Sequence, residues 1–267
     1  MKFELEDFGG DGPVLHFAHA NGFPPGTYRK LLTAWSTRFH VVAVKSRCLQ
    51  PGIPPSTMQH WETFADDLVD SLRAADLGPV LGVGHSLGGV ATLIAASRAP
   101  DLFTKVIALD PVLFSRRDEF LFRALKVTGL VKRVGPAKSA RKRREVWPSR
   151  EAAGASYRKK PLFRDFDAEC FDDYLHFGLR DVEGGVRLTI PRDWEARVFE
   201  SGPKDAFGEL KNLKVPSVFV RGESTNVFSP AAVKRVKQHV PTAQFIEARG
   251  GHLFPLEHPE LTDQLLG

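Results

Sequence analysis

The chain has 267 residues, of which 42% are hydrophobic and 26% are charged, and its formal net charge at pH 7 is +5. This composition is typical of a globular protein and excludes a disordered chain. The longest apolar runs have the length of a strand, far short of the roughly 18 residues that cross a bilayer, so we expect no membrane span.

The N-terminal segment lacks the apolar core of a signal peptide, and we therefore expect a cytoplasmic protein. Cys48 and Cys170 are too few for a disulfide framework. No group of cysteines and histidines has the spacing of a zinc site. The sequence thus predicts two unrelated free thiols and no structural metal.

Short apolar runs bounded by Gly, Pro or polar residues recur along the chain and predict buried, mostly parallel strands. The expected strands are 1–6, 14–18, 39–44, 80–83, 106–109, 215–220 and 244–247. Segments with helical periodicity lie between them, namely 61–72, 87–98 and 230–239, the last with Ser229 as N-cap. This alternation predicts an α/β fold with a parallel sheet covered by helices on both faces.

The alternation stops after Asp110 and resumes near Val215. We interpret residues 111–208 as an inserted helical cap, and residues 1–110 and 209–267 as the core. Between Arg116 and Arg164, sixteen Lys or Arg residues and four acids give a charge of +12, so the rest of the chain carries −7.

The basic run Arg141-Lys142-Arg143-Arg144 has three interpretations. It is a solvated helix face, a surface that attracts anionic substrates or anionic lipid, or a nucleic-acid contact. Because no groove-reading or aromatic-interleaved motif accompanies the charge, we expect no nucleic-acid partner. A weak attraction to anionic surfaces through the basic cap stays open.

The segment Gly84-His85-Ser86-Leu87-Gly88 matches the pattern G-x-S-x-G between an expected strand and an expected helix. In that context the serine occupies a sharp turn, and the residues two before and two after it come so close that both must be small. The turn predicts Ser86 as a nucleophile and the backbone N–H of Leu87 as one donor to an oxyanion.

Two further loops follow expected strands. After 14–18 comes His19-Ala20-Asn21-Gly22, whose Asn21 N–H is the second candidate oxyanion donor, with the Phe23 N–H as the runner-up. The expected role of His19 is to anchor this loop by hydrogen bonds. Near the C-terminus, Gly251-His252 follows the last expected strand, which makes His252 the candidate general base.

Together these three segments resemble the α/β-hydrolase superfamily, in the serine-hydrolase branch with a helical cap. The resemblance covers essentially the whole chain with the segments in the right order. It implies an α/β-hydrolase fold, a Ser–acid–His triad and no cofactor. It leaves the substrate open, because this fold hosts many chemistries.

The acid of the triad departs from the family pattern. In relatives it usually follows the penultimate strand, where this chain has Asn226, with Thr225 as the neighbouring possibility. An amide can hold a histidine in place but cannot stabilise an imidazolium, and in another serine hydrolase the change from Asp to Asn costs about 10⁴-fold in kcat. Three explanations stay open: the acid is Asp110 after the strand 106–109, Glu223 turns inward, or Asn226 marks a weakened enzyme.

The resulting hypothesis is hydrolysis of a small-molecule carboxylic ester, with thioesterase, lactonase and carbon–carbon hydrolase chemistry as related possibilities. The competing hypothesis is a binding protein that keeps the fold and has weakened catalysis because of Asn226. We expect an apolar acyl part on the substrate, lined by aromatics of the cap. The candidates are Phe114, Phe120, Phe122, Trp147, Phe163, Phe166, Phe171, Tyr174, Phe177 and Trp194.

Overall fold

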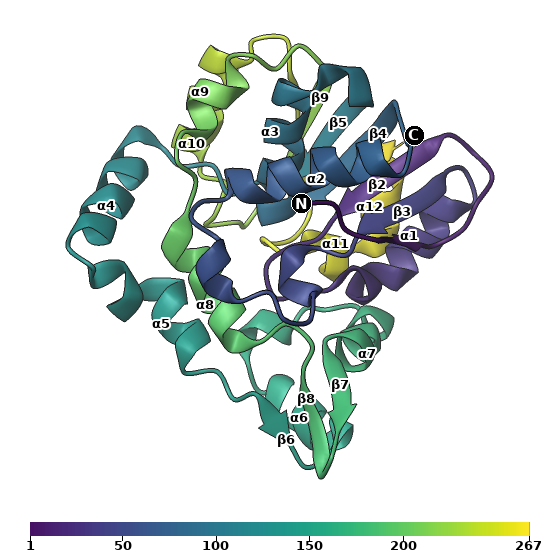
Figure 1. Ribbon diagram of the computed structural model, residues 1–267, viewed down its shortest axis with the longest axis vertical. Helices are drawn as coiled ribbons and strands as arrows, with labels where there is room; N and C mark the ends of the chain where they lie inside the picture. Colours follow the sequence, from purple (N-terminus) through teal and green to yellow (C-terminus); the bar gives the residue numbers. More distant parts are fainter. Residues whose placement is uncertain (267) are drawn as a thin grey trace.

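A computed structural model describes residues 1–266. Its centre is a seven-stranded sheet in the order β1-β3-β2-β4-β5-β9-β10 (Figure 1). Only β1 is antiparallel to its neighbour, and the other five pairs are parallel. The strands are β1 (Leu5–Asp7), β2 (Val14–Ala18), β3 (His40–Val44), β4 (Val80–His85), β5 (Phe103–Leu109), β9 (Ser217–Gly222) and β10 (Gln244–Ala248).

The predicted strands are all present, with shifted ends. Strand β9 begins at Ser217 instead of Val215, because Pro216 has no N–H to donate to the ladder. Strand β4 continues to His85, directly before the turn at Ser86. The predicted fold class, a mostly parallel sheet between helical layers, is therefore confirmed.

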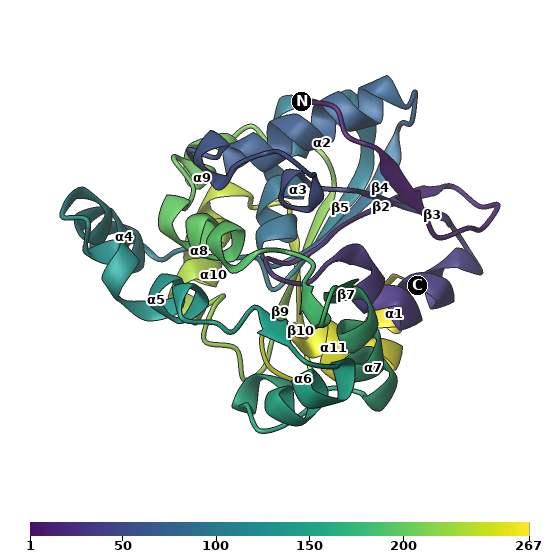
Figure 2. The same cartoon turned by 60° about the horizontal axis from the view of Figure 1, so that its bottom comes forward.

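Helices cover both faces of this sheet (Figures 1 and 2). The core helices are α1 (Arg29–Ser36), α2 (Glu62–Ala74), α3 (Leu87–Arg98), α9 (Ala206–Leu210), α10 (Pro230–His239), α11 (Phe254–Glu257) and α12 (Pro259–Asp263). Strand side chains alternate between the faces: Val106 and Ala108 pack in the cluster that contains α2 and α3, whereas Ile107 and Leu109 pack in the cluster that contains α1. Ser229 caps α10 as predicted, because its hydroxyl accepts the N–H of Ala232.

The chain between β5 and α9 forms a separate layer beside the sheet (Figure 1). Its helices are α4 (Arg116–Val127), α5 (Gly135–Arg141), α6 (Arg150–Tyr157), α7 (Ala168–Phe177) and α8 (Arg192–Ser201). Its strands are β6 (Val146–Trp147), β7 (Leu179–Val182) and β8 (Gly185–Leu188), which form an antiparallel sheet in the order β6-β8-β7. The division between core and cap at residues 110 and 209 stays a prediction.

The expectation of a purely helical cap was wrong at these three strands. Strands β7 and β8 form a hairpin in which Val182 pairs with Gly185 across Glu183 and Gly184. Gly184 has a φ of 77°, a left-handed conformation that glycine adopts without strain. The sequence signal for a turn followed by a strand is the pair Gly184-Gly185 and the alternation of Val186, Leu188 and Ile190 after it.

Two expectations about the whole chain concern its thiols and its helices. Cys48 and Cys170 are both buried and free, as predicted. Among residues 1–266, no helix combines the length and the apolar character that crossing a membrane would require.

Candidate active site

Ser86 occupies the turn between β4 and α3, with φ 57° and ψ −117°. Its N–H donates to the carbonyl oxygen of Leu109 at 2.9 Å, which ties the turn to the neighbouring strand β5. The two glycines of the motif are required because other backbone atoms lie too close to leave room for a Cβ. A Cβ on Gly84 would lie 2.4 Å from the carbonyl oxygen of Gly88, and a Cβ on Gly88 would lie 2.1 Å from that of Ala18. The sequence thus holds the serine in a strained turn at the carboxyl edge of the sheet.

His252 lies on the turn after β10 and reaches back across the strand ends to this serine. Its Nε2 is 2.9 Å from the Oγ of Ser86, and its Nδ1 is 2.6 Å from Oδ2 of Asp110. A carboxylate only accepts hydrogen bonds, so Nδ1 carries the proton and Nε2 is free to accept the serine hydroxyl. This tautomer is the one that a general base at Ser86 needs.

Asp110 follows β5, and its side chain is fully buried. Its Oδ1 accepts the N–H of Gly222 at 3.0 Å, and its Oδ2 accepts the hydroxyl of Thr225 at 2.6 Å in addition to His252. The residue has a φ of +42°, which is uncommon outside glycine and turns the carboxylate under the imidazole. Because β5 and β9 are neighbours, the end of β9 supplies the donors that hold this buried charge.

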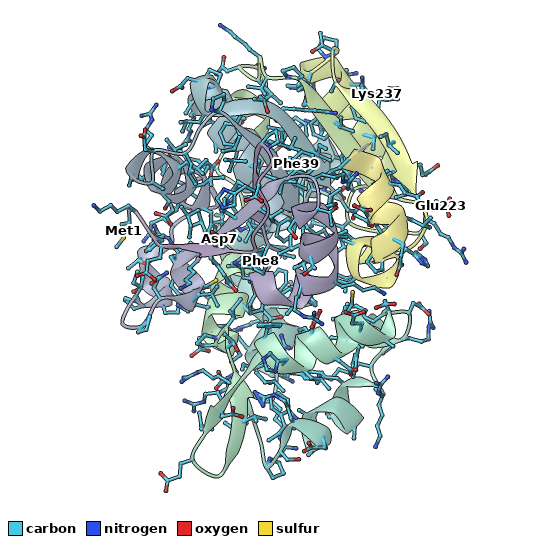
Figure 3. All side chains as sticks on the ribbon, turned by 90° about the vertical axis from the view of Figure 1, so that its right-hand side faces the viewer. Met1, Asp7, Phe8, Phe39, Glu223 and Lys237 are labelled. Atoms are coloured by element: carbon cyan, nitrogen blue, oxygen red, sulfur yellow. The ribbon has the colours of Figure 1, made fainter. Side chains whose placement is uncertain are left out.

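The other two acid candidates lie elsewhere. Asn226 and Glu223 are both exposed, and Figure 3 shows Glu223 at the surface beside β10. Among the described residues, the side chain of His252 has hydrogen bonds to Ser86 and Asp110 and to neither of these two. The loop after β9 thus presents Thr225 to the site, while Asn226 turns away from it.

The order of the strands also sets the positions of the candidate oxyanion donors. Leu87 is the first residue of α3, so its N–H has no acceptor within the helix. Asn21 follows β2, which is the neighbour of β4, and its side-chain Nδ2 donates to the carbonyl oxygen of Glu195 in α8 at 3.1 Å. The N–H of Phe23 is already bonded to the carbonyl oxygen of Ala20, so the runner-up candidate is not a free donor.

Comparison with known proteins identifies the family of this chain. The family model described as "Alpha/beta hydrolase family" matches residues 17–265. The chain belongs to this family. Among curated relatives, 2-(acetamidomethylene)succinate hydrolase from Mesorhizobium japonicum is 24% identical over 95% of this chain and 86% of the relative. Carboxylesterase YbfK from Bacillus subtilis is 26% identical, over 95% and 79% respectively.

Solved structures agree on the α/β-hydrolase fold. E-2-(acetamidomethylene)succinate hydrolase superposes with a TM-score of 0.81 at 23% identity, over 98% of this chain and 92% of that chain. A thioesterase domain from the curacin biosynthetic pathway gives a TM-score of 0.72 at 19% identity, over 98% and 93%. At these identities the likeness shows the fold, and the chemistry has to be argued from the site itself.

A buried histidine of this hydrolase, His85, supports the backbone at His252, and the sequence had not indicated this contact. His85 accepts the hydroxyl of Tyr28 on Nδ1 at 2.7 Å, while its Nε2 lies 2.8 Å from the carbonyl oxygen of His252. Burial, with a smaller contribution from the nearby His252, lowers the pKa of His85 to about 3, so the ring is neutral and its Nε2–H donates to that carbonyl. His85 therefore fixes the backbone that carries His252.

His19 anchors the loop that carries Asn21. Its Nδ1 lies 2.8 Å from the carbonyl oxygen of Ala20, and its Nε2 lies 2.7 Å from the hydroxyl of Ser46. Burial lowers the pKa of His19, which keeps the ring uncharged inside the core. These bonds agree with the structural role expected for this histidine.

An apolar cavity lies directly behind the two candidate oxyanion donors. Asn21 and Leu87 line it together with Phe64, Leu68 and Ala91 of the core helices α2 and α3. Among the described residues, no cap aromatic belongs to its lining. The cavity is therefore built by the core, on the side of Ser86 that faces α2.

Four of the ten cap aromatics pack against one another and do not line this cavity, and the expectation that cap aromatics line an acyl pocket stays a prediction for the others. Trp147, Phe163, Phe171 and Tyr174 are each at most 5% exposed. The ring centroid of Phe163 lies 4.8 Å from that of Tyr174 and 5.9 Å from that of Phe171. Because the cap has to bury apolar surface of its own, these rings form its core.

The basic run 141–144 is not one uniform solvated face. Arg143 is mostly buried, and its guanidinium pairs with Glu195 at 2.6 Å and contacts the hydroxyls of Tyr157 and Tyr174. Lys142 and Arg144 are exposed. Since Glu195 also accepts the side chain of Asn21 on its carbonyl oxygen, Arg143 helps to join the cap to the loop beside Ser86.

Proposed function

We propose that this chain is a serine hydrolase that cleaves small-molecule carboxylic esters through an acyl-enzyme. One observation carries the proposal: Ser86, His252 and Asp110 form an unbroken row of hydrogen bonds of 2.9 and 2.6 Å. Nucleophile, base and orienting carboxylate within hydrogen-bond distance are the arrangement that activates a serine.

In the first half-reaction, Nε2 of His252 accepts the hydroxyl proton of Ser86 while Oγ bonds to the acyl carbon. The carbonyl oxygen gains the negative charge and is stabilised by the backbone N–H groups of Leu87 and Asn21. The ester C–O bond then breaks, and the alkoxy oxygen takes the proton from His252. The acyl group remains bound to Ser86.

In the second half-reaction, water loses a proton to His252 and attacks the same acyl carbon. The serine–acyl bond breaks, Oγ regains its proton, and the carboxylic acid leaves. In both steps Asp110 stays ionised and stabilises the transient imidazolium. Because Asn226 is exposed and has no hydrogen bond to His252 among the described residues, its amide gives no reason to expect weakened turnover.

The apolar cavity between α2 and α3 supports an acyl part that is apolar and small. Phe64 and Leu68 are largely buried and line the same cavity as Asn21 and Leu87, so we expect the acyl chain of a bound ester to enter it. A thioester or a lactone passes through the same tetrahedral oxyanion, so the site suits these substrates as well as a simple ester. The similar proteins include both a carboxylesterase and a thioesterase domain.

The test is labelling by a fluorophosphonate probe together with hydrolysis of p-nitrophenyl butyrate. The unaltered chain should be labelled and should turn the ester over. Ser86→Ala should lose the label and about 10⁶-fold in kcat, whereas Ser56→Ala, at an exposed serine outside the site, should keep both. Labelling that persists in Ser86→Ala, or an unaltered chain that neither labels nor hydrolyses any ester, would contradict the proposal.

A further inference from the structure

Helix α4 and the turn after it expose an unusual amount of apolar surface. Of the nine large hydrophobic residues that are exposed in the described chain, five lie within residues 120–134. Phe120 is 76% exposed, Leu121 56% and Val127 89%, and Leu130 and Val134 follow at 44% and 41%. Such a concentration in one element marks an interaction surface, because scattered apolar residues would need no partner.

The helix is attached to the molecule by its opposite face. Glu119 pairs with Arg235 of α10, and the amine of Lys126 donates to the carbonyl oxygen of Ser201 at the end of α8. The ring of Phe122 lies against Gly202. Figure 2 shows α4 projecting from the edge of the molecule, and Phe120, Leu121 and Val127 of its other face are exposed.

At 100° per residue, Phe120, Ala124 and Val127 fall on one stripe of this free face, and Arg116, Arg117 and Arg123 flank it. Only Arg123 of these three cations has an ion pair among the described residues, with Glu119. The apolar stripe is thus bordered by three guanidinium groups, and those of Arg116 and Arg117 have no ion pair within residues 1–266.

The charge continues through the short 3-10 helix 130–133 and into α5. Residues 116–142 contain nine Lys or Arg and two acids, a net charge of +7. Lys132, Arg133 and Lys138 are exposed and, within residues 1–266, have no ion pair. We define residues 116–138 as the cap-edge surface.

We propose that the cap-edge surface docks on a bilayer that contains anionic phospholipid. An amphipathic helix of this kind lies in the headgroup region with its apolar stripe toward the acyl chains, while the flanking cations contact lipid phosphates. Charge complementarity alone would suit any polyanion. The exposed Phe120, Leu121 and Val127 favour a lipid surface, because an RNA backbone offers nothing apolar to cover aliphatic side chains.

This inference does not depend on the proposed ester hydrolysis, since none of these residues touches Ser86 or His252. It places the molecule so that the projecting helix α4 faces the membrane. Helix α4 begins six residues after Asp110, and the ring of Phe114 in the connecting segment contacts Trp61 of the core.

Co-sedimentation with large vesicles tests the proposal, using phosphatidylcholine alone and phosphatidylcholine mixed with phosphatidylglycerol. At low ionic strength the full chain should bind the mixed vesicles at least about tenfold more strongly than the neutral ones, and added salt should weaken that binding. Equal binding to both, or no binding to either, overturns the proposal.

Three variants locate the surface. A charge variant carries Arg116→Gln, Arg117→Gln, Lys132→Gln and Arg133→Gln. An apolar variant carries Phe120→Gln and Val127→Gln. A control variant removes the same number of exposed cations elsewhere, with Lys2→Gln, Lys105→Gln, Lys211→Gln and Lys214→Gln.

The charge and apolar variants should each lose about tenfold in vesicle affinity, whereas the control variant should lose much less. All three variants should unfold at the same temperature as the unaltered chain, which would show that their fold is intact. A control variant as weak as the charge variant would overturn the assignment. If the apolar variant binds vesicles as well as the unaltered chain, the surface is a site for polyanions and not for a bilayer. If the unaltered chain forms a dimer and binds no vesicles, and only the apolar variant is monomeric, the surface is a contact between copies of the chain.

Discussion

The loops that follow β5 and β9 lie side by side at the edge of the sheet, and they differ in what they present to His252. Leu109, the last residue of β5, pairs with Val220, so β9 runs two residues further and its last residue, Gly222, lies beside Asp110. The β5 loop presents Asp110, which is fully buried and accepts three hydrogen bonds. The β9 loop presents the hydroxyl of Thr225, while the exposed Asn226 faces solvent.

The two loops together hold one buried carboxylate against His252. The β5 loop supplies the charge, and the β9 loop supplies the N–H of Gly222 and the hydroxyl of Thr225 that hold the charge in place. Which strand carries the acid matters less than whether its carboxylate reaches Nδ1 of His252 with its remaining lone pairs satisfied. An uncompensated buried carboxylate would cost far more than its bond to the imidazole returns.

The largest effect that tests this comparison is expected at Asp110. Asp110→Asn removes the charge that stabilises the imidazolium and lets the amide favour the wrong histidine tautomer. We expect kcat for p-nitrophenyl butyrate to fall by about 10⁴-fold.

Circular dichroism and thermal unfolding serve as the control for that variant, because the amide oxygen can still accept the N–H of Gly222 while the amide NH2 group donates to the hydroxyl of Thr225. A loss of less than about tenfold with an intact fold would mean that another group stabilises the imidazolium.

A smaller effect is expected from the supporting donor in the β9 loop. Thr225→Val keeps the shape of the side chain and removes a hydrogen bond to a charged group, which is worth about 1.5–3 kcal/mol. The expected outcome is a fall in kcat of about tenfold to a hundredfold with little change in KM.

Thr225→Ser is the matched control, since it restores the hydroxyl. It should recover most of the activity that Thr225→Val loses. If both variants are equally impaired, the methyl group and not the hydrogen bond accounts for the loss.

The activities of variants in the two loops have to be compared at neutral pH, because acid lowers the free energy of unfolding of the whole molecule. Burial is the main cause that lowers the pKa of His16 and of His85 to about 3. In the unfolded chain the two histidines have a pKa of about 6.5 and bind protons below it, whereas in the folded chain both rings stay neutral. Their contribution to the free energy of unfolding is therefore fully present above pH 6.5 and is lost as the pH falls toward 3. Between pH 7 and pH 5 we expect the free energy of unfolding to fall by about 2 kcal/mol for each ring.

Urea unfolding at the two pH values measures this loss. In His16→Gln the amide oxygen can still accept the N–H of Val44, which Nε2 of His16 accepts in the unaltered chain. That variant should therefore show about half of the pH dependence attributed to the two rings. An unchanged pH dependence would assign the effect to other groups.

The smallest effect is expected at Asn226. Because its side chain is exposed and Asp110 already occupies Nδ1 of His252, Asn226→Asp should change kcat/KM by less than about threefold. Steady-state kinetics with the same ester give this value.

Much of this arrangement could be predicted from the sequence, because it depends on local rules. The turn at Ser86 follows from two glycines that no other residue can replace, and the alternation of strands and helices gives the sheet. The position of His252 follows from a Gly-rich loop after the last strand. The choice among Asp110, Glu223 and Asn226 stayed open, because it depends on the backbone turn at residue 110.

Long-range contacts explain what the sequence did not indicate. The bond from His85 to the carbonyl of His252 joins residues 167 positions apart, and the pairing of Arg143 with Glu195 joins two segments of the cap. Neither has a local pattern. The hairpin at Glu183 and Gly184 did have one, in the two glycines of its turn and the alternating apolar residues that follow.

The most direct test of the central claim is the ratio of kcat/KM between Asn226→Asp and Asp110→Asn, measured with p-nitrophenyl butyrate in one assay at neutral pH. If Asp110 is the acid of the triad, the first variant stays near the unaltered chain and the second falls by about 10⁴-fold, so the ratio is on the order of 10⁴. A ratio near one, or a gain of orders of magnitude in Asn226→Asp, would contradict the account and return the role of the acid to the β9 loop.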